Sequence, residues 1–367
     1  MIGTLKSVPI TATSPATDAV LLRKEGRAAY LTLNRPKAIN ALTRDMVLRV
    51  RAALDEWQDD TSVAAVVITG AGDRGLCAGG DIRAVREAVI TGRPREAAEF
   101  WRDEYRLNLA ISRYPKPYVA IMDGIVMGGG VGISAHGSVR LVTERSLVAM
   151  PETGIGFIPD VGGTYLLSRA PGELGTHLAL TGTAIPAADA ILCGLADHYI
   201  PSAAIPSFTA DLATEELAVA LKTHTAPAPA ALLATHRPWI DECYAADTVE
   251  EIVSRLQRHS NPTANETAAT ILTKSPTSLK VTLAALRRAR ELPNLQAVLE
   301  QEFLVSCSGL TEPDLAEGIR AQVVDKDRTP HWTPATLAEV PAEAVARFFT
   351  PPHLGDPHSY LGPLFTS

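Results

Sequence analysis

Strand-like apolar runs alternate with helical patterns over roughly the first 210 residues, and this alternation restricts the fold more than any other feature of the chain. A chain that alternates in this way buries a sheet under helices, which defines an α/β architecture. The predicted strands are AAYLTL at 28–33, VAAVVIT at 63–69, PYVAIM at 117–122, VRLVT at 139–143 and LVAM at 147–150.

The clearest predicted helix follows Thr43, whose hydroxyl can cap the first turn. Val47, Val50, Leu54 and Trp57 recur at steps of three and four residues, so they form one apolar stripe that packs on the sheet. Further helices are predicted from Asp81, over 95–113, within 128–137 and, with Ser275 or Thr277 as the cap, in the stretch SPTSLKVTLAALRRAR.

Strand signals fade beyond about residue 210, so the chain divides into three predicted regions. Residues 1–17 lack the basic start and apolar core of a signal peptide, and we expect a loose polar tail. Residues 18–210 form the predicted core. Residues 211–367 form a helical extension, in which the Ala/Pro-rich segment 226–231 resembles a linker.

Composition excludes several classes of partner. The formal net charge is −7 and no long Lys/Arg run offsets it, which argues against binding to nucleic acid or to an anionic membrane surface. No apolar run approaches the length of a membrane span. The four cysteines are widely spaced and form no CxxC pair, so we expect reduced thiols, a cytoplasmic location and no metal site.

Two carboxylates, Glu152 and Asp160, lie eight residues apart in the Gly-rich apolar segment 150–171, which has almost no basic residue. A carboxylate kept from cations and water holds its proton more tightly, and a second one nearby allows separate acid and base roles. Each residue also has a simpler interpretation. Asp160 precedes a predicted helix and suits an N-cap, and Glu152 suits a solvated loop.

Two glycine clusters, CAGGD at 77–81 and MGGGVG at 127–132, each lead into a predicted helix. Glycine lets a backbone approach a ligand closely, and a helix start presents unpaired N–H groups. The amides of Gly80 and Gly129 can therefore flank one oxygen and form an oxyanion hole for a thioester carbonyl. Taken singly, either cluster is also explained by a tight strand-to-helix turn.

Two other patterns do not carry function. GAGDRG at 70–75 matches a dinucleotide fingerprint, but no helix starts within it, so nicotinamide binding is not expected. GISAH at 132–136 has the first glycine and the serine of a nucleophile elbow but a histidine in place of the last glycine. We therefore interpret Ser134 and His136 as structural.

Four segments in order, NRPKAINAL (34–42), CAGGDI (77–82), GGGVG (128–132) and PETGIGFIPDVGG (151–163), resemble the crotonase superfamily, whose members act on acyl-coenzyme A thioesters. The resemblance covers about residues 18–330. Its finer features resemble the 3-hydroxyisobutyryl-CoA hydrolase branch, which acts in valine breakdown: PDVGG, RDEYRLN at 102–108, SPTSLK at 275–280 and DKD at 325–327. The implied fold is a spiral of ββα units with a helical C-terminal region that helps to assemble subunits into a homo-oligomer.

The resemblance also implies roles for individual residues. A hydratase of this superfamily uses two glutamates, but Gly132 occupies the place of the first, whereas Glu152 retains the second. Asp160 stands where hydratases usually carry a small residue, so hydrolysis is favoured over hydration. Gly80 and Gly129 would be the oxyanion donors, and Glu104 would bind the substrate 3-hydroxyl. Ala78, Asp81 and Ile82 would border the coenzyme A path. Arg35 and Lys37 are the candidates to meet its phosphates, with a solvated surface charge as the alternative for at least one of them.

The expected reaction is hydrolysis of a 3-hydroxyacyl-CoA thioester, with no cofactor beyond the coenzyme A of the substrate. Glu152 either attacks the carbonyl or activates water, and Asp160 orients the reacting groups. The acyl groups 3-hydroxyisobutyryl and 3-hydroxypropionyl differ by one methyl and both stay open. The alternatives are an enoyl-CoA hydratase or isomerase of the same superfamily and a non-catalytic acyl-CoA-binding scaffold.

Overall fold

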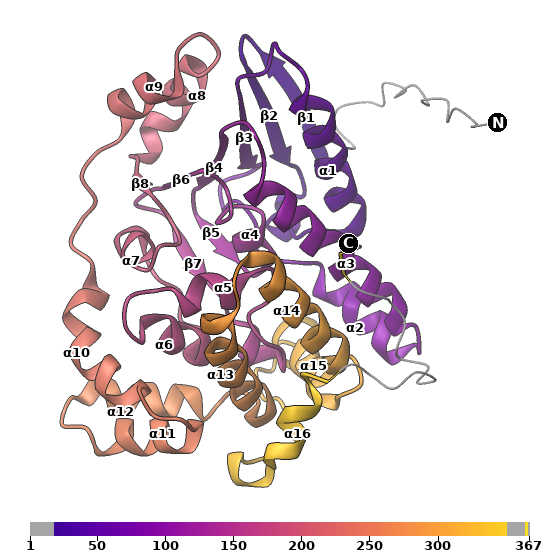
Figure 1. Cartoon of the computed structure of the whole chain (residues 1–367), viewed down its shortest axis with the longest axis vertical. Coiled ribbons are helices and arrows are strands. Elements are labelled where there is room, and N and C mark those ends of the chain that lie inside the picture. Colours follow the sequence, from indigo (N-terminus) through magenta and orange to yellow (C-terminus); the bar gives the residue numbers. More distant parts are fainter. Residues whose placement is uncertain (1–17, 351–363, 366–367) are drawn as a thin grey trace.

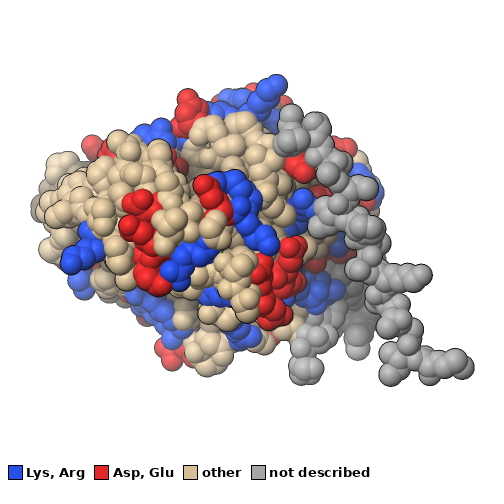
Figure 2. All heavy atoms as spheres, turned by 90° about the horizontal axis from the view of Figure 1, so that it is seen from above, with Lys and Arg blue, Asp and Glu red and all other residues tan. Residues whose placement is uncertain are grey.

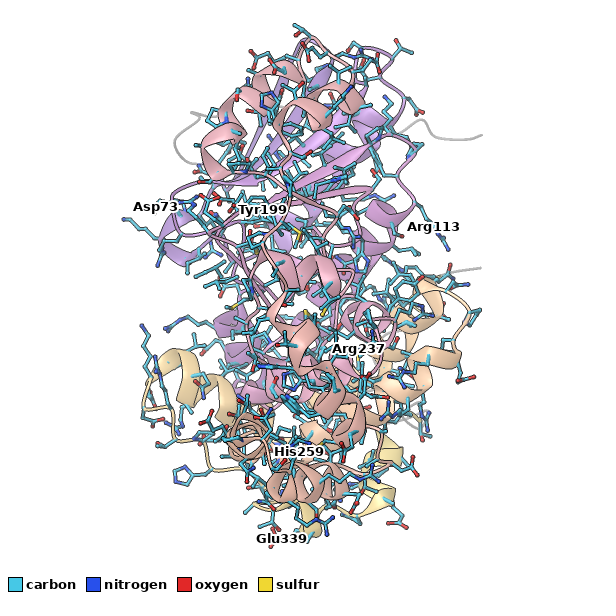
Figure 3. All side chains as sticks on the ribbon, turned by 90° about the vertical axis from the view of Figure 1, so that its left-hand side faces the viewer. Asp73, Arg113, Tyr199, Arg237, His259 and Glu339 are labelled. Atoms are coloured by element: carbon cyan, nitrogen blue, oxygen red, sulfur yellow. The ribbon has the colours of Figure 1, made fainter. Side chains whose placement is uncertain are left out.

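The computed structural model describes residues 18–350 and 364–365 of the 367-residue chain. The expected loose tail at 1–17 lies outside the described residues, as do residues 351–363 of the helical extension. Figure 1 shows the strands in the upper half of the molecule and the helices of the C-terminal region (orange to yellow) in the lower half. From the side, Tyr199 lies with the sheet, whereas His259 and Glu339 lie with the helices at the opposite end (Figure 3).

The larger sheet has six strands in the order β1-β2-β3-β4-β6-β8. β1 pairs antiparallel with β2, and every later pair is parallel. Parallel neighbours require crossover connections, which the helices supply. The strands are β1 Val20–Glu25, β2 Ala28–Leu33, β3 Ala65–Gly70, β4 Tyr118–Met122, β6 Val139–Val142 and β8 His198–Tyr199.

A second, smaller sheet pairs β5 (Ile125–Met127) with β7 (Leu147–Ala149) in parallel. Isolated bridges extend its edge, Cys77 with Val126 and Leu42 with Gly80. The chain thus passes from a strand of the large sheet to the small sheet and then to a helix, and repeats this order. This is the predicted spiral of ββα units.

Most predicted elements of the core are confirmed. The hydroxyl of Thr43 caps α1 (Arg44–Gln58) by accepting from the Met46 amide at 3.3 Å. The helices predicted from Asp81, over 95–113 and within 128–137 are α2 (Ile82–Ile90), α3 (Pro94–Ser112) and α4 (Gly129–Gly132). The prediction missed β1, β5 and β8, because β1 is a half-exposed edge strand and the other two have only three and two residues.

Helices dominate beyond residue 150, and beyond about residue 210 the described chain contains helices and no named strand, as predicted. Ser275 caps α13 by accepting from the Ser278 amide at 3.0 Å, and 226–231 forms no helix. The elements are α5 Gly163–Ser168, α6 Leu174–Thr181, α7 Ala187–Leu192, α8 Ile205–Asp211, α9 Leu217–His224, α10 Leu232–Tyr244, α11 Val249–Arg258, α12 Pro262–Ile271, α13 Pro276–Glu291, α14 Leu295–Gly309, α15 Pro313–Ile319 and α16 Ala342–Arg347. Shorter helical segments are η1 Pro36–Ala38, η2 Glu152–Ile155, η3 Ser202–Ala204, η4 Arg320–Val324 and η5 Leu337–Glu339.

The C-terminal helices pack directly on the core that carries the glycine loops. α13 and α14 contact α5, α14 contacts α3, and α15 contacts both α2 and η2 (Figure 1). The rings of Tyr105 in α3 and Phe303 in α14 meet edge to face at 6.1 Å. The main apolar cluster therefore continues from the sheet into these helices.

Charged side chains of both signs are interspersed on the face seen from above, where Lys and Arg form no continuous patch (Figure 2). Within the described residues, no helix is both long and apolar enough to cross a membrane.

Candidate active site

A cavity of about 680 Å³ opens where the glycine loops meet η2 and the C-terminal helices. This volume lies within the range of small-molecule sites. All ten residues that the sequence assigned to a site line it: Arg35, Lys37, Ala78, Gly80, Asp81, Ile82, Glu104, Gly129, Glu152 and Asp160. The structure thus brings together side chains and amides from five separate segments of the chain.

The two glycine loops touch backbone to backbone. A Cβ on Gly130 would lie 2.3 Å from the Cys77 carbonyl oxygen, so this position has room only for glycine. A Cβ on Gly129 would lie 3.2 Å from the Gly80 amide nitrogen. Within the described chain, neither the Gly80 nor the Gly129 N–H donates a hydrogen bond. Both amides are free to bind an oxygen in the cavity.

Three buried carboxyl groups face this pair of amides. Glu104, Glu152 and Asp160 are 2%, 6% and 6% exposed. A Cβ on Gly129 would lie 2.5 Å from Oε1 of Glu104, and one on Gly128 would lie 2.9 Å from Oε1 of Glu152. The glutamates therefore lie against consecutive residues of one glycine loop.

The electrostatic setting raises the pKa of all three carboxyls. Burial raises the pKa of Glu104 and of Glu152 well above the usual range, and the charge of Asp160 adds to both effects. Burial also raises the pKa of Asp160 to about 7, although the Tyr105 hydroxyl, which donates to Oδ2 at 2.7 Å, works in the opposite direction. Among the described residues, Oε1 of Glu104 and Oε2 of Glu152 have no hydrogen-bond partner, so each is available to a ligand.

The interpretation of Asp160 as a helix cap is wrong. α5 begins only at Gly163, and the Asp160 carboxyl turns to Tyr105 instead of to the helix amides. Glu302 of α14 takes the capping role by accepting from the Gly162 and Thr164 amides at 2.6 and 2.9 Å. The interpretation of Glu152 as a solvated loop residue is also wrong, because Glu152 is buried as the first residue of η2.

Gly132 has no space for a longer side chain. A Cβ there would lie 2.6 Å from Cβ of Val161 and 3.0 Å from Nδ2 of Asn108. A glutamate at this position would collide with the loop that carries Asp160. The absence of the first hydratase glutamate is therefore built into the packing.

The rim of the cavity carries the residues expected to meet coenzyme A. Arg35 is partly committed to the wall, since it pairs with Asp81 at 3.0 Å and donates to the Ala41 carbonyl at 2.6 Å. Lys37 is exposed at the rim. Ala78 donates its amide to the Ile39 carbonyl at 2.9 Å, which joins the wall to the 34–42 loop.

Several lining residues were not predicted. The rings of Trp101 and Phe157 stack at 4.9 Å and form an aromatic wall. Lys274 and Lys326 reach the cavity from the C-terminal region, where only the KSPTSLK and DKD stretches hinted at a role. Tyr105 does not line the cavity but contacts Asp160 from behind it. Its position directly after Glu104 was the only sequence signal for it.

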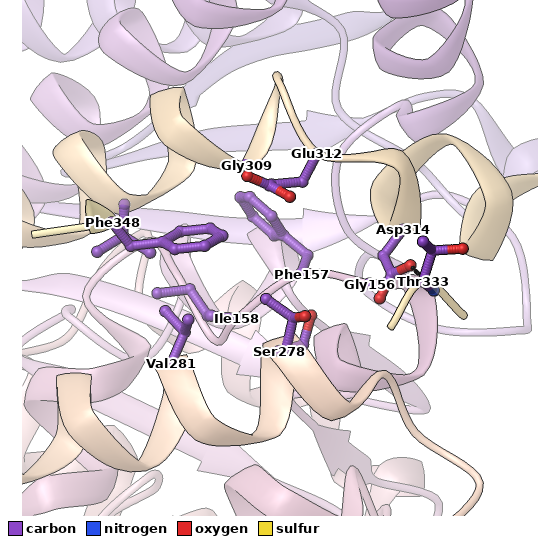
Figure 4. Close-up of a pocket in the computed structure, with 12 residues that line it drawn as sticks. Gly156, Phe157, Ile158, Ser278, Val281, Gly309, Glu312, Asp314, Thr333 and Phe348 are labelled. Carbon is purple, nitrogen blue, oxygen red and sulfur yellow. Dashed lines mark hydrogen bonds between the residues drawn. The ribbon is translucent and has the colours of Figure 1, made fainter. Parts of the chain in front are cut away.

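Phe157 also lines a second, much smaller hollow of about 10 Å³, which Figure 4 shows. Phe348, Val281 and Ile158 line this hollow together with Gly309. It has room for about one water molecule, so it is a packing defect beside the aromatic wall and not a ligand site.

Ser134 and His136 are structural, as predicted. The buried Ser134 hydroxyl donates to the Gly130 carbonyl at 2.6 Å. His136 lies with Nε2 2.7 Å from the Val161 carbonyl oxygen, and burial lowers its pKa to about 4. Among the described residues, no group of three or more His, Cys, Asp or Glu side chains is arranged to hold a metal ion.

Residues 28–349 match a protein family described as enoyl-CoA hydratase/isomerase. The chain belongs to this family. It is 41% identical to human "3-hydroxyisobutyryl-CoA hydrolase, mitochondrial" over 345 residues. This aligned region covers 91% of this chain and 89% of the human protein. The Xenopus tropicalis protein of the same name is 42% identical over 341 residues, 90% of this chain and 88% of that protein.

Two solved structures share the fold closely. A carnitinyl-CoA dehydratase from Mycobacterium thermoresistibile has a TM-score of 0.89 and 54% identity, with 94% of this chain and 98% of that chain covered. An enoyl-CoA hydratase from Rhodobacter sphaeroides has a TM-score of 0.86 and 40% identity, with 91% and 98% covered. These matches show that the spiral, with its helical C-terminal region, is the fold of this family.

The raised pKa of Asp160 predicts a pH-dependent effect of Asp160→Asn on stability. Because the folded-state pKa, about 7, lies above the ordinary value of 3.8, the folded state holds the extra proton and stability falls as pH rises between these values. Asparagine removes this cost. We expect the substitution to add more stability at pH 8 than at pH 5, by on the order of 1 kcal/mol, in urea denaturation.

Asp247→Asn is the matched control, because Asp247 is exposed to solvent and does not line the cavity. An Asp160→Asn effect that is equal at both pH values contradicts the assignment of a raised pKa to Asp160.

Proposed function

We propose that this protein hydrolyses the thioester of 3-hydroxyisobutyryl-CoA to the free 3-hydroxy acid and coenzyme A. The observation that carries the proposal is the convergence of two unbonded amides, at Gly80 and Gly129, with the buried carboxyls of Glu104 and Glu152. The relatives named 3-hydroxyisobutyryl-CoA hydrolase, which match nine-tenths of the chain, support the substrate class.

The geometry supports a division of labour. The thioester carbonyl oxygen binds between the Gly80 and Gly129 amides, which stabilise the negative charge that develops there. Glu152 lies beside this position. Either its carboxylate attacks the carbonyl carbon, the C–S bond breaks with release of the coenzyme A thiolate, and water opens the resulting anhydride, or it takes a proton from water that attacks and expels the thiolate directly. In both cases the thiolate takes up a proton and leaves as the free thiol. The unpartnered Oε1 of Glu104 accepts from the 3-hydroxyl, and Asp160 orients the reacting groups.

Coenzyme A leaves the cavity through the rim. Positive charge for its phosphates comes there from Lys37, Lys274 and Lys326. The part of the Arg35 guanidinium that is not paired with Asp81 adds to this charge. Ala78 and Ile82 border the narrower path toward the glycine amides. The chemistry uses carboxyls and backbone amides, so the proposal requires no cofactor beyond the substrate.

Hydration of an enoyl-CoA is the second candidate, and the names of the two close structural relatives favour it. The packing around Gly132 argues against it, because the first hydratase glutamate has no space there. Asp160 would then have to replace that glutamate from a different loop.

The proposal also includes the cytoplasm as location and a homo-oligomer as the working state. All four cysteines are free thiols, which suits a reducing compartment. Light scattering should give a multiple of the chain mass of 39.0 kDa. A single-chain mass at micromolar concentration would rule out the stable oligomer.

Thiol release tests the function directly. The wild type should release thiol from 3-hydroxyisobutyryl-CoA, followed with a thiol-reactive dye. Glu152→Gln and Asp160→Asn should each lower the rate by about 100-fold or more, because each removes a carboxylate from the reacting centre. Asp247→Asn should leave the rate unchanged.

Crotonyl-CoA separates the candidates in the same assay. Water addition to crotonyl-CoA without thiol release from the 3-hydroxyacyl thioester would establish the hydratase alternative. Binding of coenzyme A without either reaction would establish a non-catalytic scaffold.

Gly129→Ala tests the oxyanion site. The added methyl would lie 2.5 Å from Oε1 of Glu104 and 3.2 Å from the Gly80 amide, so it fills the space meant for the carbonyl oxygen. We expect thiol release to fall by about 100-fold, as for loss of one oxyanion donor. Gly154→Ala is the matched control, because its methyl would make only an ordinary 3.7 Å contact in the same cavity. Equal activity of both variants would contradict the oxyanion assignment.

A further inference from the structure

One face of α14 reaches the loop that carries Asp160. Glu302 and Ser306 lie one turn apart on this helix and are both fully buried. Residues at this spacing point to the same side of a helix. Glu302 contacts the segment that joins η2 to α5, and Ser306 contacts Tyr105 of α3.

Glu302 fixes the end of this segment. Its carboxylate accepts from the Gly162 amide at 2.6 Å, from the Thr164 amide at 2.9 Å and from the Thr164 hydroxyl. Three donors on one carboxylate hold the start of α5 at a constant distance from α14. The turn two residues after Asp160 is thereby immobilised.

Ser306 acts on Asp160 through Tyr105. The Tyr105 hydroxyl lies 2.7 Å from Oδ2 of Asp160 and 2.8 Å from Oγ of Ser306. A tyrosine has one hydroxyl proton, so when it donates to the Asp160 carboxylate, the Ser306 hydroxyl donates to the tyrosine oxygen. A directed chain of hydrogen bonds runs from α14 through α3 to Asp160.

The backbone between these two anchors is strained. Val161 has a φ of 52°, a left-handed conformation that is rare for a β-branched residue. Its carbonyl accepts from Nε2 of His136 at 2.7 Å. Strain of this kind persists only where surrounding contacts determine the conformation. Here Tyr105, His136 and Glu302 hold it from three directions, with the Asp160 carboxyl turned into the cavity.

We propose that Tyr105, anchored by Ser306 of α14, is a positioning residue that sets the orientation of the Asp160 carboxyl for the reaction. The inference rests on the proposed role of Asp160 in hydrolysis. It makes the C-terminal helix α14 part of the active site without contact to the substrate.

The hydrogen bond from Tyr105 to Asp160 lies among several other titratable groups. The titratable groups around Asp160 are Glu104 and Tyr105 from α3, Glu152 from η2, His136 after α4, Glu302 from α14 and, on the cavity wall, Lys274. Three of these are carboxyls. The Tyr105 hydroxyl is the side-chain contact that lowers the pKa of Asp160 against the effect of burial.

Tyr105→Phe tests the proposal, with the pH profile of kcat/KM for thiol release as the readout. Loss of the hydroxyl raises the pKa of Asp160 further, so the limb of the profile that reports Asp160 should move to higher pH. We expect kcat to fall about 10- to 100-fold, as for loss of a hydrogen bond to a charged group, with KM little changed. Ser306→Ala should shift the same limb in the same direction by less.

Tyr118→Phe is the matched control. Tyr118 is equally buried and donates one hydrogen bond, to the Ile133 carbonyl at 2.9 Å, outside the cavity. Its substitution should lower stability and leave the pH profile unchanged. A Tyr105→Phe enzyme with lower stability and an unshifted profile would overturn the proposal.

A measurement without turnover separates this inference from the proposed function. The pH dependence of the stability gained from Asp160→Asn should extend to higher pH in the Tyr105→Phe background. If this extension is observed but the wild type releases no thiol, the effect of Tyr105 on Asp160 is supported and hydrolysis is refuted. An unchanged pH dependence in an active wild-type enzyme would refute the link alone.

Discussion

The backbone contact between residues 77–80 and 127–130 is the constraint on which the site depends. Gly130 permits it, because a Cβ there would meet the Cys77 carbonyl oxygen at 2.3 Å. The contact occurs where the small sheet bridges Cys77 to Val126, so the spiral itself brings the two loops together. Two amides from different turns of the spiral then face one cavity. The proposed oxyanion site is in this sense a consequence of the fold.

A second property of the cavity is its group of buried acids. The carboxyls of Glu104, Glu152 and Asp160 are buried together, and none is paired with a basic side chain within the described residues. Such an arrangement costs stability, because each buried carboxyl must either take up a proton or remain charged without hydration. A structural role would favour neutral side chains of similar size. Three buried acids without a paired cation therefore support the proposed catalytic site.

The sequence grouped residues correctly into one cavity where its signals were local. Gly80, Gly129 and Glu152 each belong to a short Gly-rich cluster, and all three line the cavity. Asp160 was assigned two roles, and the choice between them depended on Glu302, which lies 140 residues from Gly162 in the chain. The Tyr105–Ser306 contact spans 201 residues. Contacts of this separation are set by helix packing, which periodicity does not encode.

The position of Asp160 in the chain explains why the C-terminal helices contribute to the proposed site. In the hydratase pattern, a glutamate at position 132 would be supported by its own helix, α4. Here Val161 closes that position, and Asp160 lies on the strained loop instead. On the side of α4, the next residue of this loop, Val161, accepts a hydrogen bond from His136, which follows that helix. Its remaining support comes from α3 and α14. A carboxyl moved off a regular helix requires support from elsewhere in the chain, and the packing of α14 on α3 and α5 provides it.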